Sequence, residues 1–111
     1  MKWIEVIQLR STGCDKDFLI TELRKLIDKN EKSTKKQMVM AYSRVLIDTD
    51  YNIQIFHETK NVEKNGSPLG LRLVSALKAF GFVNHSIWVA LNNKENEDIH
   101  VSQNKENKKS L

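Results

Sequence analysis

Histidines are the side chains of this 111-residue chain that could accept a proton near neutral pH, and there are three of them: His57, His85 and His100. An unperturbed imidazole titrates between about pH 5 and 8, so it can act as a general base without a special environment. His85 lies in the stretch "VNHSIWVAL", which alternates like a strand. This alternation places His85 on the more apolar side, where helices would cover it. We predict His85 as a catalytic proton acceptor at the edge of a ligand pocket; the alternative is a hydrogen-bonded core histidine.

Aromatic side chains near His85 could give that pocket its shape. We expect Tyr42, Phe80 and Phe82 to line it. The same alternation places Asn84 and Trp88 on the opposite side of the strand. Large aromatic side chains contribute strongly to buried interfaces, so we expect Trp88 and Asn84 to face a partner subunit.

A metal site is not expected. His57 ends one expected strand and His85 begins another, so we expect their imidazoles to lie roughly 15 Å or more apart, too far to share one ion. The chain has no HExxH or CxxC motif. Cys14 is the single cysteine and has no obvious partner, so we expect an inert thiol. No metal and no other cofactor is predicted.

The elements that must position these residues follow from hydrophobic spacing and from the residues that start and stop helices. Asp15 and Ser67 are expected helix N-caps, and Gly81 is an expected left-handed stop. "DTDYN" has the composition of a hairpin turn. The expected order is a strand at 3–10, a helix from 15 to about 29, strands within 37–48 and 51–59, a helix from 68, and a strand at 83–91.

This order predicts an α+β fold of the ferredoxin-like βαββαβ type. Its four-stranded antiparallel sheet would have the strand order 4-1-3-2, with two helices on one face. We expect residues 1–91 to form this domain and residues 92–111 to form a polar C-terminal tail, partly disordered, because Ile99 and Val101 are nearly its only apolar residues.

Composition limits the class of protein. A single cysteine rules out an internal disulfide and fits a reducing compartment, and no stretch approaches the ~20 apolar residues of a membrane span. We therefore expect a cytoplasmic protein without membrane contact. The net charge is +4, but the basic residues are dispersed apart from Lys32, Lys35 and Lys36, so no nucleic-acid partner is predicted.

The second strand carries apolar residues on both of its faces. Val39 and Ala41 alternate with Met38, Met40 and Tyr42, whereas two helices can cover only one face of the sheet. An exposed apolar face of that size is unusual in a monomer. We therefore predict a homodimer that pairs through the sheet face opposite the helices.

The element order, the doubly apolar strands and the long middle hairpin resemble the dimeric α+β barrel superfamily, and most nearly its antibiotic biosynthesis monooxygenase-like proteins. The resemblance covers residues 3–91 and lies in the pattern of elements. It implies a homodimer whose two sheets form one barrel, with a small pocket in each subunit between sheet and helices. The haem-degrading branch uses an asparagine on the first strand, whereas this chain has Glu5 and Gln8 there.

Two functional classes are carried forward. The first is a cofactor-independent monooxygenase-like enzyme that acts on a small aromatic or quinol-like molecule, with His85 as proton acceptor. The second is a non-catalytic homodimer that binds a small ligand or serves as a scaffold. An RNA-binding module on the same element order lacks its aromatic signature here.

Overall fold

A computed structural model describes residues 1–13, 15–31 and 37–93. The element order is the expected one. The elements are β1 (Lys2–Ser11), α1 (Lys16–Glu31), β2 (Met38–Arg44), β3 (Ile47–Glu58), α2 (Pro68–Leu77) and β4 (Gly81–Val89). An α+β fold with four antiparallel strands and two helices, compatible with the ferredoxin-like type, is thereby confirmed. None of the described helices has the length and apolarity needed to cross a membrane.

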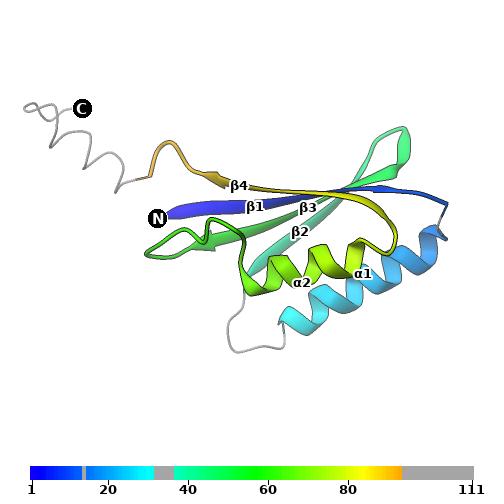
Figure 1. The fold of residues 1–111 in the computed structure, drawn as a ribbon, viewed down its shortest axis with the longest axis horizontal. Coiled ribbons are helices and arrows are strands. Elements are labelled where there is room, and N and C mark those ends of the chain that lie inside the picture. The colour runs from blue at the N-terminus through cyan, green and yellow to red at the C-terminus, as the bar shows by residue number, and fades with distance from the viewer. Residues whose placement is uncertain (14, 32–36, 94–111) are drawn as a thin grey trace, which may run out of the picture.

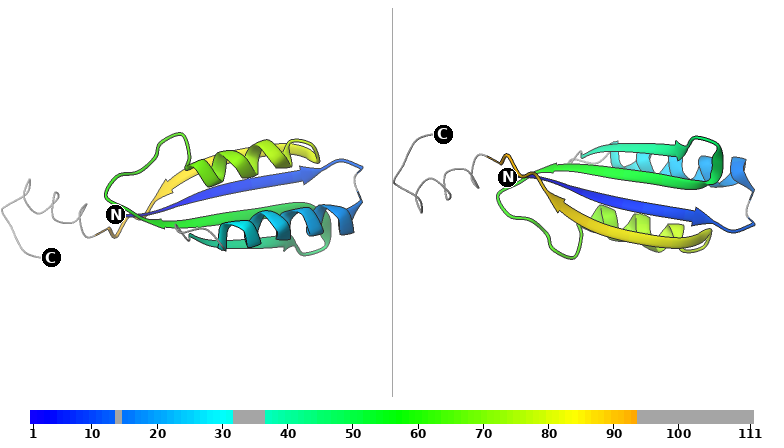
Figure 2. Two further views of the ribbon diagram at one scale, coloured as in Figure 1. Left: turned by 90° about the horizontal axis from the view of Figure 1, so that it is seen from below. Right: turned by 90° about the horizontal axis from the view of Figure 1, so that it is seen from above.

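The four strands form one open sheet, with both helices on one face. The strand order is β2-β3-β1-β4, which read from the β4 edge is 4-1-3-2. All three neighbouring pairs are antiparallel. Figure 1 shows the two-layer arrangement, and Figure 2 shows both helices in front of the sheet from below and behind it from above. We call the helix-covered side of the sheet its inner face and the other side its outer face.

Both helices begin at the side chains that the sequence indicates. Oδ1 of Asp15 accepts hydrogen bonds from the amides of Asp17 and Phe18, at 2.9 and 3.2 Å. The Ser67 side chain accepts one from the amide of Gly70, at 3.0 Å, and Pro68 occupies the first turn. These bonds satisfy amides that have no partner within the helix. The Ser67 cap also fixes where α2 starts above β1.

Alternating residues of the central strands form the core beneath the helices. Ile7 and Leu9 of β1 are buried with Ile53 and Ile55 of β3. The apolar stripes of both helices cover them, and the helical members of this core are Leu19, Leu23, Leu69, Leu73 and Leu77. Burying this surface is the main driving force for folding. The core contains one set of alternating residues from the strands, and the other set lies on the outer face.

The hairpin between β2 and β3 turns earlier than expected. The turn is at Val45 and Leu46, and Leu46 has a positive φ of 69°. The prediction that "DTDYN" forms the turn is wrong, because these residues lie within β3. Asp50 is held there by ion pairs with Arg10 and Arg44, at 3.3 and 3.1 Å, which favour a strand position over a turn.

The role of Gly81 also differs from expectation. Gly81 is not a left-handed helix stop: it begins β4, and a Cβ there would collide with the backbone of Arg10 and Ser11. Close approach of two strands is therefore the reason for this glycine. Beyond β4, Asn93 is buried and donates to the carbonyl of Lys2 at 2.9 Å, so ordered contacts continue past residue 91.

Candidate functional site

A carboxylate lies at the centre of the buried polar residues. Glu5 points to the inner face of β1, between Trp3 and Ile7, and it is fully buried. A buried carboxylate is costly unless hydrogen bonds or charges compensate it. Its partners come from β3, β4 and the start of α2, and we call Glu5, His57, Ser67 and His85 the Glu5 cluster.

Four hydrogen bonds converge on the Glu5 carboxylate. Oε2 accepts from Nε2 of His57 at 2.6 Å and from the hydroxyl of Ser67. Oε1 accepts from Nε2 of His85 at 2.8 Å and from the amide of Ser67 at 3.1 Å. A carboxylate offers about four acceptor positions, so those of Glu5 are filled by the protein itself.

These bonds keep Glu5 ionised despite its burial. Burial by itself would raise the pKa of Glu5, but the hydrogen bonds from Ser67, His57 and His85 outweigh it and lower that pKa below the usual 4.5. Hydrogen bonds to the charged form of a group stabilise that form. Glu5 is thus a fixed negative charge beneath α2, and it has no free acceptor position with which to serve as a base.

His57 is the structural histidine of the cluster. Its side chain is 2% exposed, and its ring stacks on Trp3 with 3.9 Å between ring centroids. Gln37 contacts Nδ1 of His57 at 3.3 Å, while Nε2 faces Glu5. With the Gln37 amide nitrogen as donor, Nδ1 of His57 accepts and Nε2 donates to Glu5. Both ring nitrogens are then occupied, so His57 has no atom left for a substrate.

His85 differs from His57 in having one nitrogen to spare. Its Nε2 donates to Glu5, and within the described part of the chain Nδ1 has no hydrogen-bond partner. Its side chain is 15% exposed, so solvent reaches it. A carboxylate that holds one nitrogen of an imidazole fixes the tautomer and leaves the other nitrogen able to accept a proton. This is the arrangement that the predicted role of His85 requires.

Two glycines make room for the cluster. A Cβ at Gly70, in the first turn of α2, would collide with Oε1 of Glu5. Gly66 has a positive φ of 105°, and a Cβ there would collide with Cε1 of His85. The loop before α2 and the first turn of the helix therefore lie directly on the polar groups. Larger residues at these positions would displace Glu5 or His85.

The expected separation of His57 and His85 is wrong, since both rings contact one carboxylate. Trp3 of β1 pairs with His57 of β3, and Ile7 of β1 pairs with His85 of β4. Along the direction of β1, the two histidines therefore lie on either side of Glu5. Diagonal neighbours across strands are within reach of long side chains, and both rings lean toward Glu5. Within residues 1–13, 15–31 and 37–93, no group of three or more His, Cys, Asp or Glu side chains is placed to hold a metal ion.

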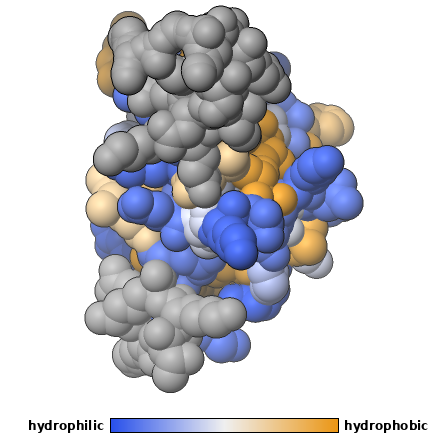
Figure 3. All heavy atoms as spheres, turned by 90° about the vertical axis from the view of Figure 1, so that its left-hand side faces the viewer, coloured by the Kyte–Doolittle hydropathy of each residue, from blue (hydrophilic) through white to orange (hydrophobic). Residues whose placement is uncertain are grey.

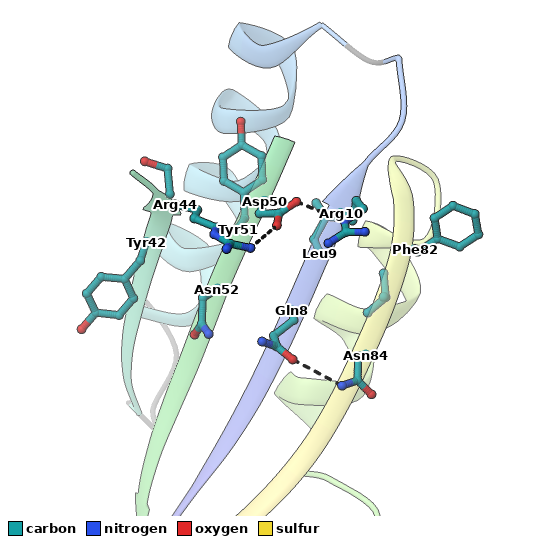
Figure 4. Close-up of a pocket in the computed structure, with 12 residues that line it drawn as sticks. Gln8, Leu9, Arg10, Tyr42, Arg44, Asp50, Tyr51, Asn52, Phe82 and Asn84 are labelled. Carbon is teal, nitrogen blue, oxygen red and sulfur yellow. Dashed lines mark hydrogen bonds and ion pairs between the residues drawn. The ribbon is translucent and has the colours of Figure 1, made fainter. Parts of the chain in front are cut away.

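The residues expected to line one pocket are divided between the two faces of the sheet. Phe80 lies on the inner side, against the core and 5.9 Å from Phe18 between ring centroids. Tyr42, Phe82 and Asn84 lie on the outer face, at the rim of a hollow of about 550 Å³ (Figure 4). His85 is on the other side of the sheet from this hollow. The structure thus does not bring Tyr42 or Phe82 to His85.

Apolar side chains are exposed along the outer face, as the doubly apolar strands indicate. Trp88 is 58% exposed and Met38 63% exposed. A second hollow of about 490 Å³ lies beside Trp88, Phe56 and Ile4. Figure 3 views the end of the molecule that holds the N-terminus and shows hydrophobic surface beside hydrophilic side chains there. Asn84 and Trp88 therefore lie on the face where a partner subunit is expected.

No family model, curated protein or solved structure matches this chain.

Proposed function

We propose that this chain is the subunit of a homodimeric α+β barrel protein that acts on a small aromatic or quinol-like molecule without a cofactor. The observation that carries the chemistry is the geometry of His85, whose Nε2 is held by Glu5 at 2.8 Å while Nδ1 is unpaired among the described residues. Support for the dimer comes from the exposed apolar side chains of the outer face.

His85 would start the reaction by removing a proton from the substrate. Nδ1 accepts the proton, and the ionised Glu5 stabilises the imidazolium that forms. The substrate anion then supplies the electrons that reduce O₂. In the balanced reaction, a CH₂ group and O₂ give a carbonyl group and water, so one oxygen atom enters the product and the substrate is the only reductant.

A non-catalytic homodimer is the second candidate, and two observations favour it. The acceptor positions of Glu5 are all filled within the protein, as in a cluster that only holds α2 on the sheet. The two hollows described above are lined mostly by outer-face residues, and neither lining includes His85. In this case the dimer would bind a ligand or serve as a scaffold, and His85 would be a hydrogen-bonded edge residue.

Oxygen uptake separates the two candidates. The parent protein is compared with His85→Ala and with His85→Gln over a panel of quinols and anthrone-like phenols. Glutamine retains an amide donor for Glu5 but cannot accept the proton, so the enzyme proposal predicts that both variants lose the activity. Asn61→Ala changes an exposed loop residue and is the matched control. Equal uptake by parent and His85→Gln would contradict the role of His85, and no uptake by the parent would favour the non-catalytic dimer.

A further inference from the structure

Strand register divides the outer face into rows of side chains that run across all four strands. Three of these rows differ sharply in chemistry. In the order from β2 to β4, the apolar row contains Met38, Phe56, Ile4 and Trp88. The mixed row contains Met40, Gln54, Val6 and Ser86. The amide row contains Tyr42, Asn52, Gln8 and Asn84.

A fourth row completes the gradient from apolar to charged. It contains Asp50, Arg10 and Phe82 by register, and Arg44 through its ion pair with Asp50. The two arginine side chains are 68% and 59% exposed. Figure 4 shows Arg10 and Arg44 converging on Asp50, above the linked pair Gln8 and Asn84. We call this the charged row; the apolar row lies at the opposite end of the strands.

A second copy of this chain can pair face to face in two aligned ways. If the two-fold axis runs parallel to the strands, each row meets the same row of the partner. If the axis lies in the sheet plane but perpendicular to the strands, the apolar row meets the partner's charged row. We infer that the axis runs parallel to the strands, so that apolar, mixed, amide and charged rows each face their own kind. This inference rests on the proposed homodimer.

The apolar and charged rows decide between the two axes. Row on row, Met38 lies opposite the partner's Trp88, and apolar surface is buried at ~25 cal/mol per Å². Arg10 lies opposite the partner's Asp50, which brings a second carboxylate to the Arg10 guanidinium. With the perpendicular axis, Arg10 and Arg44 would be covered by apolar side chains. The two arginines share the single negative charge of Asp50, so apolar cover would remove water from a group with one uncompensated positive charge, which is costly.

The amide row supplies a further match. Nδ2 of Asn84 donates to Oε1 of Gln8 at 3.3 Å, which leaves the Gln8 amide nitrogen available as a donor. Oδ1 of Asn52 is buried and has no hydrogen-bond partner among the described residues. Row on row, Gln8 lies opposite the partner's Asn52. A turn of the Asn52 amide toward that donor would satisfy an acceptor that a single chain leaves unpaired, a state that is costly for a buried polar atom.

Cross-linking of paired cysteines tests the direction of the axis. In a Cys14→Ser background, Met38→Cys with Trp88→Cys places two thiols at opposite edges of one sheet, about 14 Å apart across three strand spacings. A bis-maleimide shorter than that span can join them only between subunits. We expect this pair to give covalent dimers. The milder pair Met40→Cys with Ser86→Cys, in the mixed row, is expected to do the same.

The matched control is Met38→Cys with Arg44→Cys, both in β2. These residues face each other only if the axis is perpendicular to the strands, so this pair is expected to give no covalent dimer. A covalent dimer from this pair would overturn the inferred axis. So would a lack of cross-linking in the first two pairs while sedimentation still gives a dimer. A monomer in sedimentation would overturn the proposed homodimer as well, so the two failures are distinguishable.

The amide match is tested in the intact chain. Asn52→Ala is expected to raise the dimer dissociation constant about tenfold or more, because each dimer loses two hydrogen bonds between subunits. Asn61→Ala, in the loop after β3, is expected to leave it unchanged. An unchanged or lower dissociation constant for Asn52→Ala would show that the partner gives Asn52 no donor, and would overturn the amide match.

Discussion

Replacement of Glu5 by glutamine is the perturbation with the largest expected effect on stability. Glutamine has nearly the same shape, but one of the two oxygens becomes an NH₂ group. Whichever oxygen is lost, two of the four donors around Glu5 then face another donor. The remaining bonds also lose their ionic partner. No water is available at a fully buried site to repair them.

The magnitude follows from the burial and the number of bonds. Hydrogen bonds to charged groups contribute about 1.5–3 kcal/mol each, and breaking a buried charged network costs about 3–5 kcal/mol. For a domain of this size that corresponds to a fall in Tm of roughly 15–30 °C. Urea unfolding followed by circular dichroism, at one protein concentration, measures the free energy of unfolding for parent and variant.

Glu22→Gln is the matched control for the same chemical change. Glu22 is a partly exposed residue of α1 that contacts Lys25 at 3.1 Å, and surface pairs of this kind contribute at most about 1 kcal/mol. We expect its effect to be within about 0.5 kcal/mol of zero. If Glu5→Gln also changed the free energy of unfolding by less than about 1 kcal/mol, the Glu5 cluster would not be holding α2 and β4 on β1.

The remaining predictions concern pH, packing, the outer face and the tail. Folding lowers the pKa of Glu5 below 4.5, so the contribution of Glu5 to stability is fully present above about pH 4.5 and is lost as the pH falls through the folded pKa. Acid unfolding curves of Glu5→Gln should lack this pH-dependent loss of stability. Gly70→Ala should destabilise the fold by about 1–2 kcal/mol in thermal melts, since the collision with Glu5 outweighs a gain of about 1 kcal/mol in helix propensity; a stabilised variant would contradict the packing. Trp88→Glu should give aggregated or unfolded chains in gel filtration, and a folded monomer would count against the dimer. Deletion of residues 103–111, which lie outside the described residues, should leave Tm unchanged because the segment has one apolar residue; a drop of several degrees would show that it docks.

Local rules predict the elements and the faces of this fold well. Periodicity predicts the order of strands and helices, and the cap residues Asp15 and Ser67 mark where both helices begin. Strict alternation along β4 places His85 on the inner face and Trp88 on the outer face, as observed. These features depend on residues within a few positions of one another, which is why they can be read from the sequence.

The Glu5 cluster could not be predicted in the same way. Its members are 52 to 80 positions away from Glu5 along the chain. One observation in the sequence could have indicated the cluster. Alternation places Glu5 on the same face of its strand as Trp3 and Ile7, and helices cover that face. A buried carboxylate requires donors, and histidines and a cap serine are the donors available. The expected distance between His57 and His85 takes backbone spacing into account but not the reach of two side chains toward one carboxylate.

The early hairpin turn has a different cause. Asp and Asn favour turns through local hydrogen bonds, and the composition of "DTDYN" predicts a turn on that ground. In the structure, Asp50 instead contacts Arg10 of β1, which is 40 positions away in the chain, and Arg44 of the neighbouring strand β2. Tertiary ion pairing thus overrides a local preference, and the exposed Val45 and Leu46 form the turn.

Sedimentation equilibrium of the intact chain at micromolar concentration tests the proposed homodimer most directly. The exposed apolar side chains of the outer face should drive association, and an obligate pairing of this kind buries upwards of ~2,000 Å² in total. We expect a single species with twice the chain mass of 12.9 kDa. A stable, soluble species with the mass of one chain would contradict it.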